Sequence, residues 1–212
     1  MSSREKILKE IAQNKPAAIS LPAPFLVERE QQPLLPKFME MLQSIGGEAK
    51  LVEDWHEVLY CLQQKISDGL EVANAVQKLA PYNIEHYRTK SGAEVQTVHS
   101  VFLQGGIAVA ENAAIWVSEV SMGNRMLPFI CEQLIIVINQ SDIVATMHDA
   151  YERLRVNEDG YGVFIAGPSK TADIEQSLVI GAHGPLSLQV FIVKRKLNNK
   201  FHYETDTFWR NK

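Results

Sequence analysis

The chain has 212 residues, 46% of them hydrophobic, which is enough for one sizeable domain or for two of about 100 residues each. Its formal net charge is −4, from 21 basic and 25 acidic side chains, and this balance argues against nucleic acid or an anionic membrane as a partner. The polar N-terminus lacks an apolar signal core, and no apolar stretch approaches the length of a membrane span. We therefore expect a cytoplasmic protein without a membrane span.

The two cysteines, Cys61 and Cys131, lie far apart in the sequence. Neither belongs to a CxxC pair or to a Cys/His pattern typical of zinc or iron–sulfur sites. We expect both to be buried, reduced thiols, and the chain to hold no metal and no cofactor of its own.

Three regions are predicted along the chain. In the first, residues 1–32, Ser2 or Ser3 is a suitable N-cap for a helix that ends near Gln13, and a proline-containing extended arm follows. The second, residues 33–196, has the patterns of a folded domain. The third, residues 197–212, is an aromatic tail that either packs on the domain or meets a partner.

The domain begins with a helix predicted over residues 33–45, which the pair Gly46–Gly47 ends as a C-cap. A strand is predicted over residues 49–52. Asp54 and Glu57 then form a capping-box pattern at the start of a second helix. Another strand is predicted within residues 70–76.

Strand patterns dominate the second half of the domain. Predicted strands cover residues 98–103, 107–110, 115–118, 134–138, 163–166 and 190–193, the last three as buried runs. Ser141 or Asp142 is the predicted cap of a helix that continues to Leu154. The alternation of strands and helices predicts an α/β fold with a largely parallel central sheet and flanking helices.

Small polar residues are densest between residues 167 and 193, where Ser169, Lys170 and Thr171 follow a Gly-Pro break after an apolar run. Hydroxyls, an ammonium group and free N–H groups at a strand end form a natural site for a carboxylate, phosphate or pyrophosphate. The structural alternative is that Thr171 caps a helix entered at Ala172, with Asp173 favourable to its dipole.

The block from Gly167 to Glu175, followed by Gly181-Ala182-His183-Gly184-Pro185, resembles the signature of the LUD domain family, that of lactate-utilisation protein C. The resemblance covers about residues 92–194. It implies a fold similar to the group of ribose-5-phosphate isomerase, glucosamine-6-phosphate deaminase and CoA-transferases. It also implies a role beside two iron–sulfur partner proteins in bacterial L-lactate oxidation, with the clusters only on those partners.

The chain departs from the family pattern after Glu111, where Asn112-Ala113 replaces the usual Thr-Gly turn. Asn tolerates a positive φ angle, so the turn can survive, but a hydroxyl and a close backbone approach are lost. Any ligand contact that relatives make at this turn is therefore in question here.

Further candidate residues are each weighed against a structural role. Glu111 is a candidate base or nucleophile by analogy of fold with CoA-transferases. Asp173 and Glu175 lie on different faces of the predicted helix, so one of them at most faces a pocket. His183 and Gly184 are candidates for a pocket border, with a hydrogen-bonded structural histidine as the alternative. Arg125 suits a substrate carboxylate, or a salt bridge that anchors the loop after it.

Two functional hypotheses follow. The first is an accessory subunit of a lactate-oxidising iron–sulfur system, which binds a small anion or partner proteins. The alternative is an enzyme that acts on a nucleotide, CoA ester or phosphorylated small molecule, in the manner of a CoA-transferase or a cyclo-ligase. A module that has lost its site is a third, weaker possibility.

Overall fold

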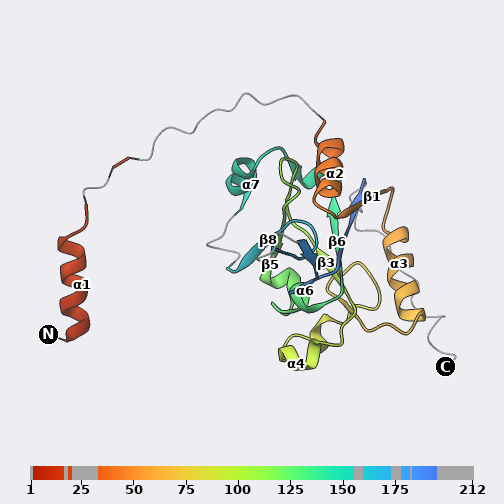
Figure 1. Ribbon diagram of the computed structural model, residues 1–212, viewed down its shortest axis with the longest axis horizontal. Helices are drawn as coiled ribbons and strands as arrows, with labels where there is room; N and C mark the ends of the chain where they lie inside the picture. The colour runs from red at the N-terminus through yellow and green to blue at the C-terminus, as the bar shows by residue number, and fades with distance from the viewer. Residues whose placement is uncertain are drawn as a thin grey trace. The chain divides into compact units, whose positions relative to one another are not determined.

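The computed structural model describes residues 2–16, 19–20, 33–154, 160–172, 178–181 and 183–194. The chain divides into two units, residues 1–31 and 32–212, and each is described by itself (Figure 1). In the first unit, helix α1 (Ser3–Gln13) begins at a capping box, in which the Ser2 side chain accepts from Glu5 N and Glu5 accepts from Ser2 N. This helix confirms the prediction. Most of the predicted extended arm and the whole aromatic tail lie outside the described residues.

The second unit is built on a five-stranded parallel sheet, which confirms the predicted fold class. Its order is β1-β11-β6-β3-β2. The strands are β1 (Glu48–Val52), β11 (Ser187–Val193), β6 (Gln133–Asn139), β3 (Ser100–Gln104) and β2 (Val72–Asn74). Apolar runs such as Leu134–Ile138 form these strands because both faces of a parallel sheet are covered and both must be apolar.

A smaller sheet of four strands packs on one face of the central sheet. Its order is β7-β4-β5-β8, from β7 (Ile143–Val144), β4 (Ala108–Val109), β5 (Ile115–Ser118) and β8 (Gly162–Ile165). The chain crosses between the sheets at Gly105, where an added Cβ would lie 2.7 Å from side chains of Ile115 and Ile138. Strand β8 lies at the edge of this sheet and is half-buried, so the prediction that residues 163–166 form a fully buried strand is wrong.

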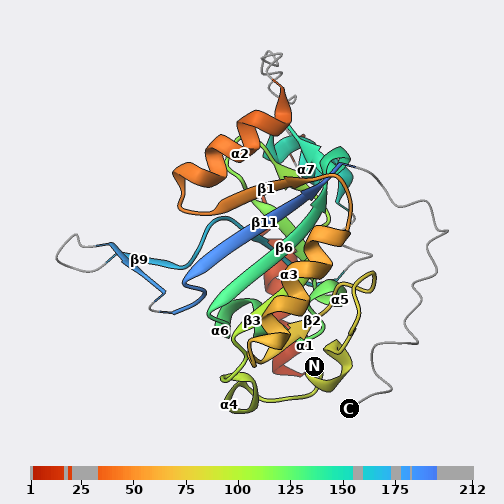
Figure 2. The ribbon, with the colours of Figure 1, turned by 90° about the vertical axis from the view of Figure 1, so that its right-hand side faces the viewer.

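Helices complete the layers. Helix α2 (Leu34–Ser44) buries Phe38 and Leu42 in the larger core, which the smaller sheet shares, and α3 (His56–Ser67) covers the opposite face (Figures 1 and 2). Short helical segments join the strands: η1 (Ile84–His86), α4 (Gly92–Val95), α5 (Glu119–Met122), α6 (Leu127–Ile130), η2 (Gln140–Asp142) and α7 (Met147–Arg153). None of the helices within the described ranges is long and apolar enough to cross a bilayer.

Two predicted helix starts are wrong. Helix α3 has Trp55 as its N-cap, while Asp54 accepts from His56 N at 2.9 Å and Glu57 pairs with Lys50 at 3.0 Å. No helix begins at Ser141 or Asp142: the chain forms η2 and then β7, and α7 begins only after the Thr146 capping box. Ile143 and Val144 form a strand instead because they pair with β4 and are buried there.

Candidate functional site

The signature segment lies at the amino edge of the central sheet, the edge where its parallel strands begin. Leu186 N donates to Glu132 O at 2.8 Å immediately before β11 and β6 start, and Ser169 N donates to Pro185 O at 2.9 Å. Ligands of open α/β sheets usually bind outside the opposite, carboxyl edge. The anion site was predicted on the expectation that this segment follows the end of a buried strand, where such ligands usually bind. The segment lies instead at the amino edge.

The described residues 170–172 and 178–180 form two paired strands, where a helix start was the structural alternative. Strand β9 (Lys170–Ala172) pairs antiparallel with β10 (Leu178–Ile180), and Thr171 is in register with Val179. The prediction that Thr171 caps a helix is therefore wrong, because the backbone there pairs with a neighbouring strand. Among its described residues, the predicted anion site consequently has no helix N-terminus to supply free N–H groups. Asp173 and Glu175 lie outside the described residues.

The glycines of the signature are explained by close packing at the base of this hairpin. An added Cβ on Gly184 would lie 2.9 Å from Ser169 Cβ, and one on Gly167, whose φ is +74°, would lie 2.9 Å from Ile45 O. Gly181 N also donates to Ser169 O at 3.0 Å. The structure thus brings Ser169 and Gly184 together, with His183 exposed beside them.

Lys170 lies on the outer side of the turn between α2 and β1. A Cβ added to Gly46 in that turn would be 3.8 Å from Lys170 Cε and 3.6 Å from Pro168 Cγ. The turn itself is a Schellman motif, in which Gly46 N donates to Gln43 O and Gly47 N to Leu42 O. This arrangement confirms the predicted glycine C-cap.

Glu111 lies at the other end of the molecule from the hairpin. Its Oε1 accepts from Met147 N at 2.8 Å and so satisfies an amide at the start of α7. Figure 2 shows α7 and β9 on opposite sides of the domain. The structure therefore does not bring Glu111 to the signature segment, and its carboxylate already has a structural partner.

The turn after Glu111 survives the departure from the family pattern. Asn112 Oδ1 accepts from Ala114 N at 3.0 Å, and Ala113 adopts a φ of +56°. The left-handed residue is thus Ala113, which stands where the resemblance to the family predicts glycine. Because a Cβ disfavours this conformation, the substitution stores backbone strain at a buried position.

Arg125 forms the predicted salt bridge. Its Nε and a terminal nitrogen donate to the two carboxylate oxygens of Glu119 at 2.7 and 2.9 Å, and its guanidinium stacks 4.5 Å from the Tyr161 ring centre. The hydrogen bonds lower the pKa of Glu119 and raise that of Arg125. The guanidinium fork is therefore already occupied by a carboxylate of this chain.

The structure shows a cavity that sequence analysis missed. It has a volume of about 370 Å³ and lies at the amino ends of β1, β11 and β6, beside the last turn of α3. It is lined by Gly46, Gly47, Glu48, Lys65, Gln133, Leu134, Ile135, Ser187, Leu188 and Gln189. The sequence did contain a signal for this cavity: Gln133 and Gln189 interrupt the apolar pattern of two buried strands.

Neither cysteine provides a reactive thiolate. Burial raises the pKa of Cys131 to about 12 and raises that of the half-buried Cys61, against the opposing effect of nearby lysines. Across the described ranges, no three His, Cys, Asp or Glu residues come close enough together to hold a metal ion.

Exposed apolar side chains come from segments on either side of the hairpin base. Phe129 on α6 is 42% exposed and Leu186 is 54% exposed, and Phe129 O lies 3.6 Å from a Cβ added to Gly184. Met126, the N-cap of α6, and Val120 on α5 are also exposed. We call Met126, Phe129 and Leu186, together with the hairpin, the hairpin surface.

The fold and this edge define an α/β protein with a hairpin at the amino edge of its central sheet. The chain belongs to the LUD domain family, which matches residues 74–193. This family was predicted from the signature segment.

Several curated relatives are called lactate utilization protein C. The chain is 32% identical to the one from Shouchella clausii over 54% of its own length and 51% of the relative's. It is 33% identical to the one from Bacillus velezensis, over 71% and 58%. The matches to the first of these relatives thus span about half of their length or less.

Among solved structures, the chain resembles a DUF162 family protein from Deinococcus radiodurans. The TM-score is 0.60 with 21% identity, over 76% of this chain and 96% of the other. At this identity the likeness supports the fold alone.

Proposed function

We propose that this protein is an accessory subunit of a bacterial, cytoplasmic lactate-utilisation system, and that it contacts two iron–sulfur partner proteins through the hairpin surface. The names of its relatives support the process. The family signature supports the choice of the hairpin surface as the contact site, because signature residues form the base of the hairpin. In this proposal the iron–sulfur clusters belong to the partners.

The observation that carries the proposal is the exposure of apolar side chains beside a hairpin that extends away from the sheet (Figure 2). Interfaces are enriched in aromatic residues and Met. The candidate reactive groups support a binding role over catalysis, because Glu111 and Arg125 are engaged by Met147 N and Glu119.

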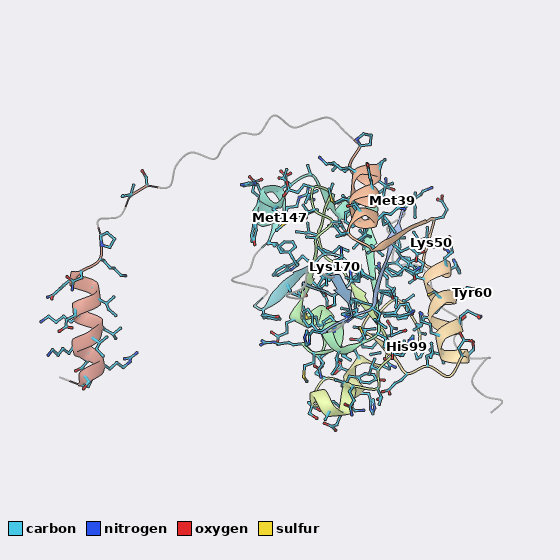
Figure 3. All side chains as sticks on the ribbon, in the orientation of Figure 1. Met39, Lys50, Tyr60, His99, Met147 and Lys170 are labelled. Atoms are coloured by element: carbon cyan, nitrogen blue, oxygen red, sulfur yellow. The ribbon has the colours of Figure 1, made fainter. Side chains whose placement is uncertain are left out.

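The test is growth on L-lactate after deletion of the gene in a host without a paralogue, followed by complementation. Complementation with Phe129→Asp plus Leu186→Asp should fail to restore growth and should abolish co-purification with the two cluster-carrying proteins. Tyr60→Asp is the matched control, because Tyr60 is exposed on the outer side of α3 (Figure 3). Normal growth of the deletion strain, or co-purification that survives the double substitution, would contradict the proposal.

The alternative, an enzyme acting on a small molecule, is favoured by one observation only, the cavity at the amino edge. A likeness to the CoA-transferase group would fit such an activity. Turnover of a CoA ester or nucleotide by the purified protein would support this alternative.

A further inference from the structure

The polar side chains of the cavity lie where a buried sheet face should be apolar. Gln133 precedes Ile135 and Val137 on the face of β6 that α3 covers, and Gln189 precedes Phe191 and Val193 on β11. Alternation along a strand puts each glutamine on the same face as the apolar residues that follow it. Leucine at these two positions would extend the apolar core. Glutamine at both positions therefore gives up the stabilisation that burying an apolar side chain would provide.

The cavity has one ammonium group among these amides. Lys65, in the last turn of α3, donates from Nζ to Gln133 Oε1. Since this partner is a neutral amide, the contact brings no opposite charge to Lys65 Nζ. An anion that reached Nζ would supply the compensating charge at the edge of a low-dielectric core.

The remaining polar groups suit a ligand that also donates a hydrogen bond. Glu48 contributes a carboxylate, which accepts only, and Ser187 contributes a hydroxyl, which does both. A cavity of about 370 Å³ is at the small end of the range for ligand sites, which is roughly 300 to 1,000 Å³. One cation and one anion among neutral donors match a singly charged small molecule.

We propose that this cavity binds a small monocarboxylate that also carries a hydroxyl or amino group. The ligand's carboxylate binds Lys65 Nζ and the amide of Gln133 or Gln189, and its hydroxyl or amino group donates to Glu48. A phosphate fits poorly, because no arginine and no helix N-terminus line the cavity among the residues that the structure describes. This inference does not rest on the proposed partner binding.

The site is distinct from the anion site predicted at Ser169–Thr171. The Gly46–Gly47 turn separates them, since it lines the cavity while Gly46 packs against Pro168 and Lys170. Lysine substitutions on either side of this turn therefore decide which of the two sites binds the anion.

The experiment is calorimetric titration of the full chain with sodium L-lactate, L-serine, acetate and inorganic phosphate. L-Lactate or L-serine should bind saturably, and acetate, which lacks the second polar group, should bind at least about tenfold more weakly. Phosphate should give no saturable signal. Lys65→Met should weaken binding at least about tenfold, because it removes a charge-assisted hydrogen bond. Lys37→Met, at a half-buried lysine on α2 that does not line the cavity, is the matched control and should leave the affinity unchanged.

Gln189→Leu keeps the test decisive if Lys65→Met disturbs folding, because leucine continues the apolar row of β11 and should also weaken binding. No saturable binding of either two-group carboxylate by the unaltered protein would overturn the inference. Tighter binding of phosphate would overturn the ligand class. Loss of binding in Lys170→Met with retention in Lys65→Met would move the site to the Ser169–Thr171 segment. Co-purification of partner proteins, measured on the same variants, would report on the proposed function separately.

Discussion

The two edges of the central sheet differ in the interactions that their side chains make. At the carboxyl edge they pair with one another: Lys194 with Glu53, and Asn139 with Asp142. At the amino edge lie the family signature, exposed apolar residues and the cavity beside Lys65. Both proposed binding sites therefore lie at the amino edge of this parallel sheet, although the carboxyl edge is the usual place for a ligand.

The largest expected loss of stability comes from a substitution in the core between the central sheet and α3. Phe102 on β3 is fully buried under α3, so Phe102→Ala should lower the free energy of unfolding by about 3–5 kcal/mol. Urea unfolding would measure the change, with Tyr60→Ala as the exposed control. A loss as small as that of the control would mean that α3 does not cover this face tightly.

A smaller effect is expected at the base of the hairpin. Gly184→Ala places a Cβ 2.9 Å from Ser169 Cβ, and this overpacking should cost about 1–3 kcal/mol and reduce partner co-purification. Gly106→Ala, where the nearest contact is an ordinary 3.5 Å, should be close to neutral. Equal costs at the two positions would remove the packing explanation for the signature glycine.

Alkaline pH should lower the free energy of unfolding through the thiol of Cys131, which precedes β6 at the amino edge. Its thiol has a pKa of about 12 when folded, against 9.0 for an ordinary thiol, so the unfolded chain loses its proton first as the pH rises. Stability from this group is complete below pH 9 and should fall by about 1 kcal/mol between pH 9 and 10. The difference in unfolding free energy between the unaltered protein and Cys131→Ala, followed over this interval, isolates the contribution. A difference that does not change with pH would contradict it.

The smallest expected effect is a gain in stability at the turn between β4 and β5. Ala113→Gly should raise the free energy of unfolding by about 0.5–1 kcal/mol, because glycine adopts the observed φ of +56° without a Cβ penalty. Thermal unfolding would detect this gain. Ala114→Gly, at the next residue, is the control and should destabilise. No gain from Ala113→Gly would show that this turn is not strained.

Elements with a strong local signal were predicted well. The strand over residues 115–118 was placed at its observed ends, and the helix ended by Gly46–Gly47 lies within one residue of the prediction. Prediction failed at Ile143 and Thr171, whose neighbours also suit a helix. Both residues pair with strands that are distant or still to come in the chain, β4 and β10, and no local pattern records that pairing.

The candidate site was predicted only in part. The signature segment identified the family and drew attention to Ser169 and Gly184, which do lie together. Arg125 was recognised as a candidate for the salt bridge that it forms, but its partner Glu119 was not. Lys65, Gln133 and Gln189 were overlooked, because each is an ordinary polar residue until three strands and a helix bring them to one cavity.

By itself the sequence determined the α/β class, the buried strands of the central sheet and the family, because apolar periodicity, glycine caps and a contiguous signature are local properties of the chain. Only the tertiary structure decided that the signature builds a hairpin at the amino edge and that Glu111 lies away from it. The physical reason is that strand pairing and the meeting of distant side chains depend on the order of strands in the sheet. That order is a property of the packed domain and not of any one segment.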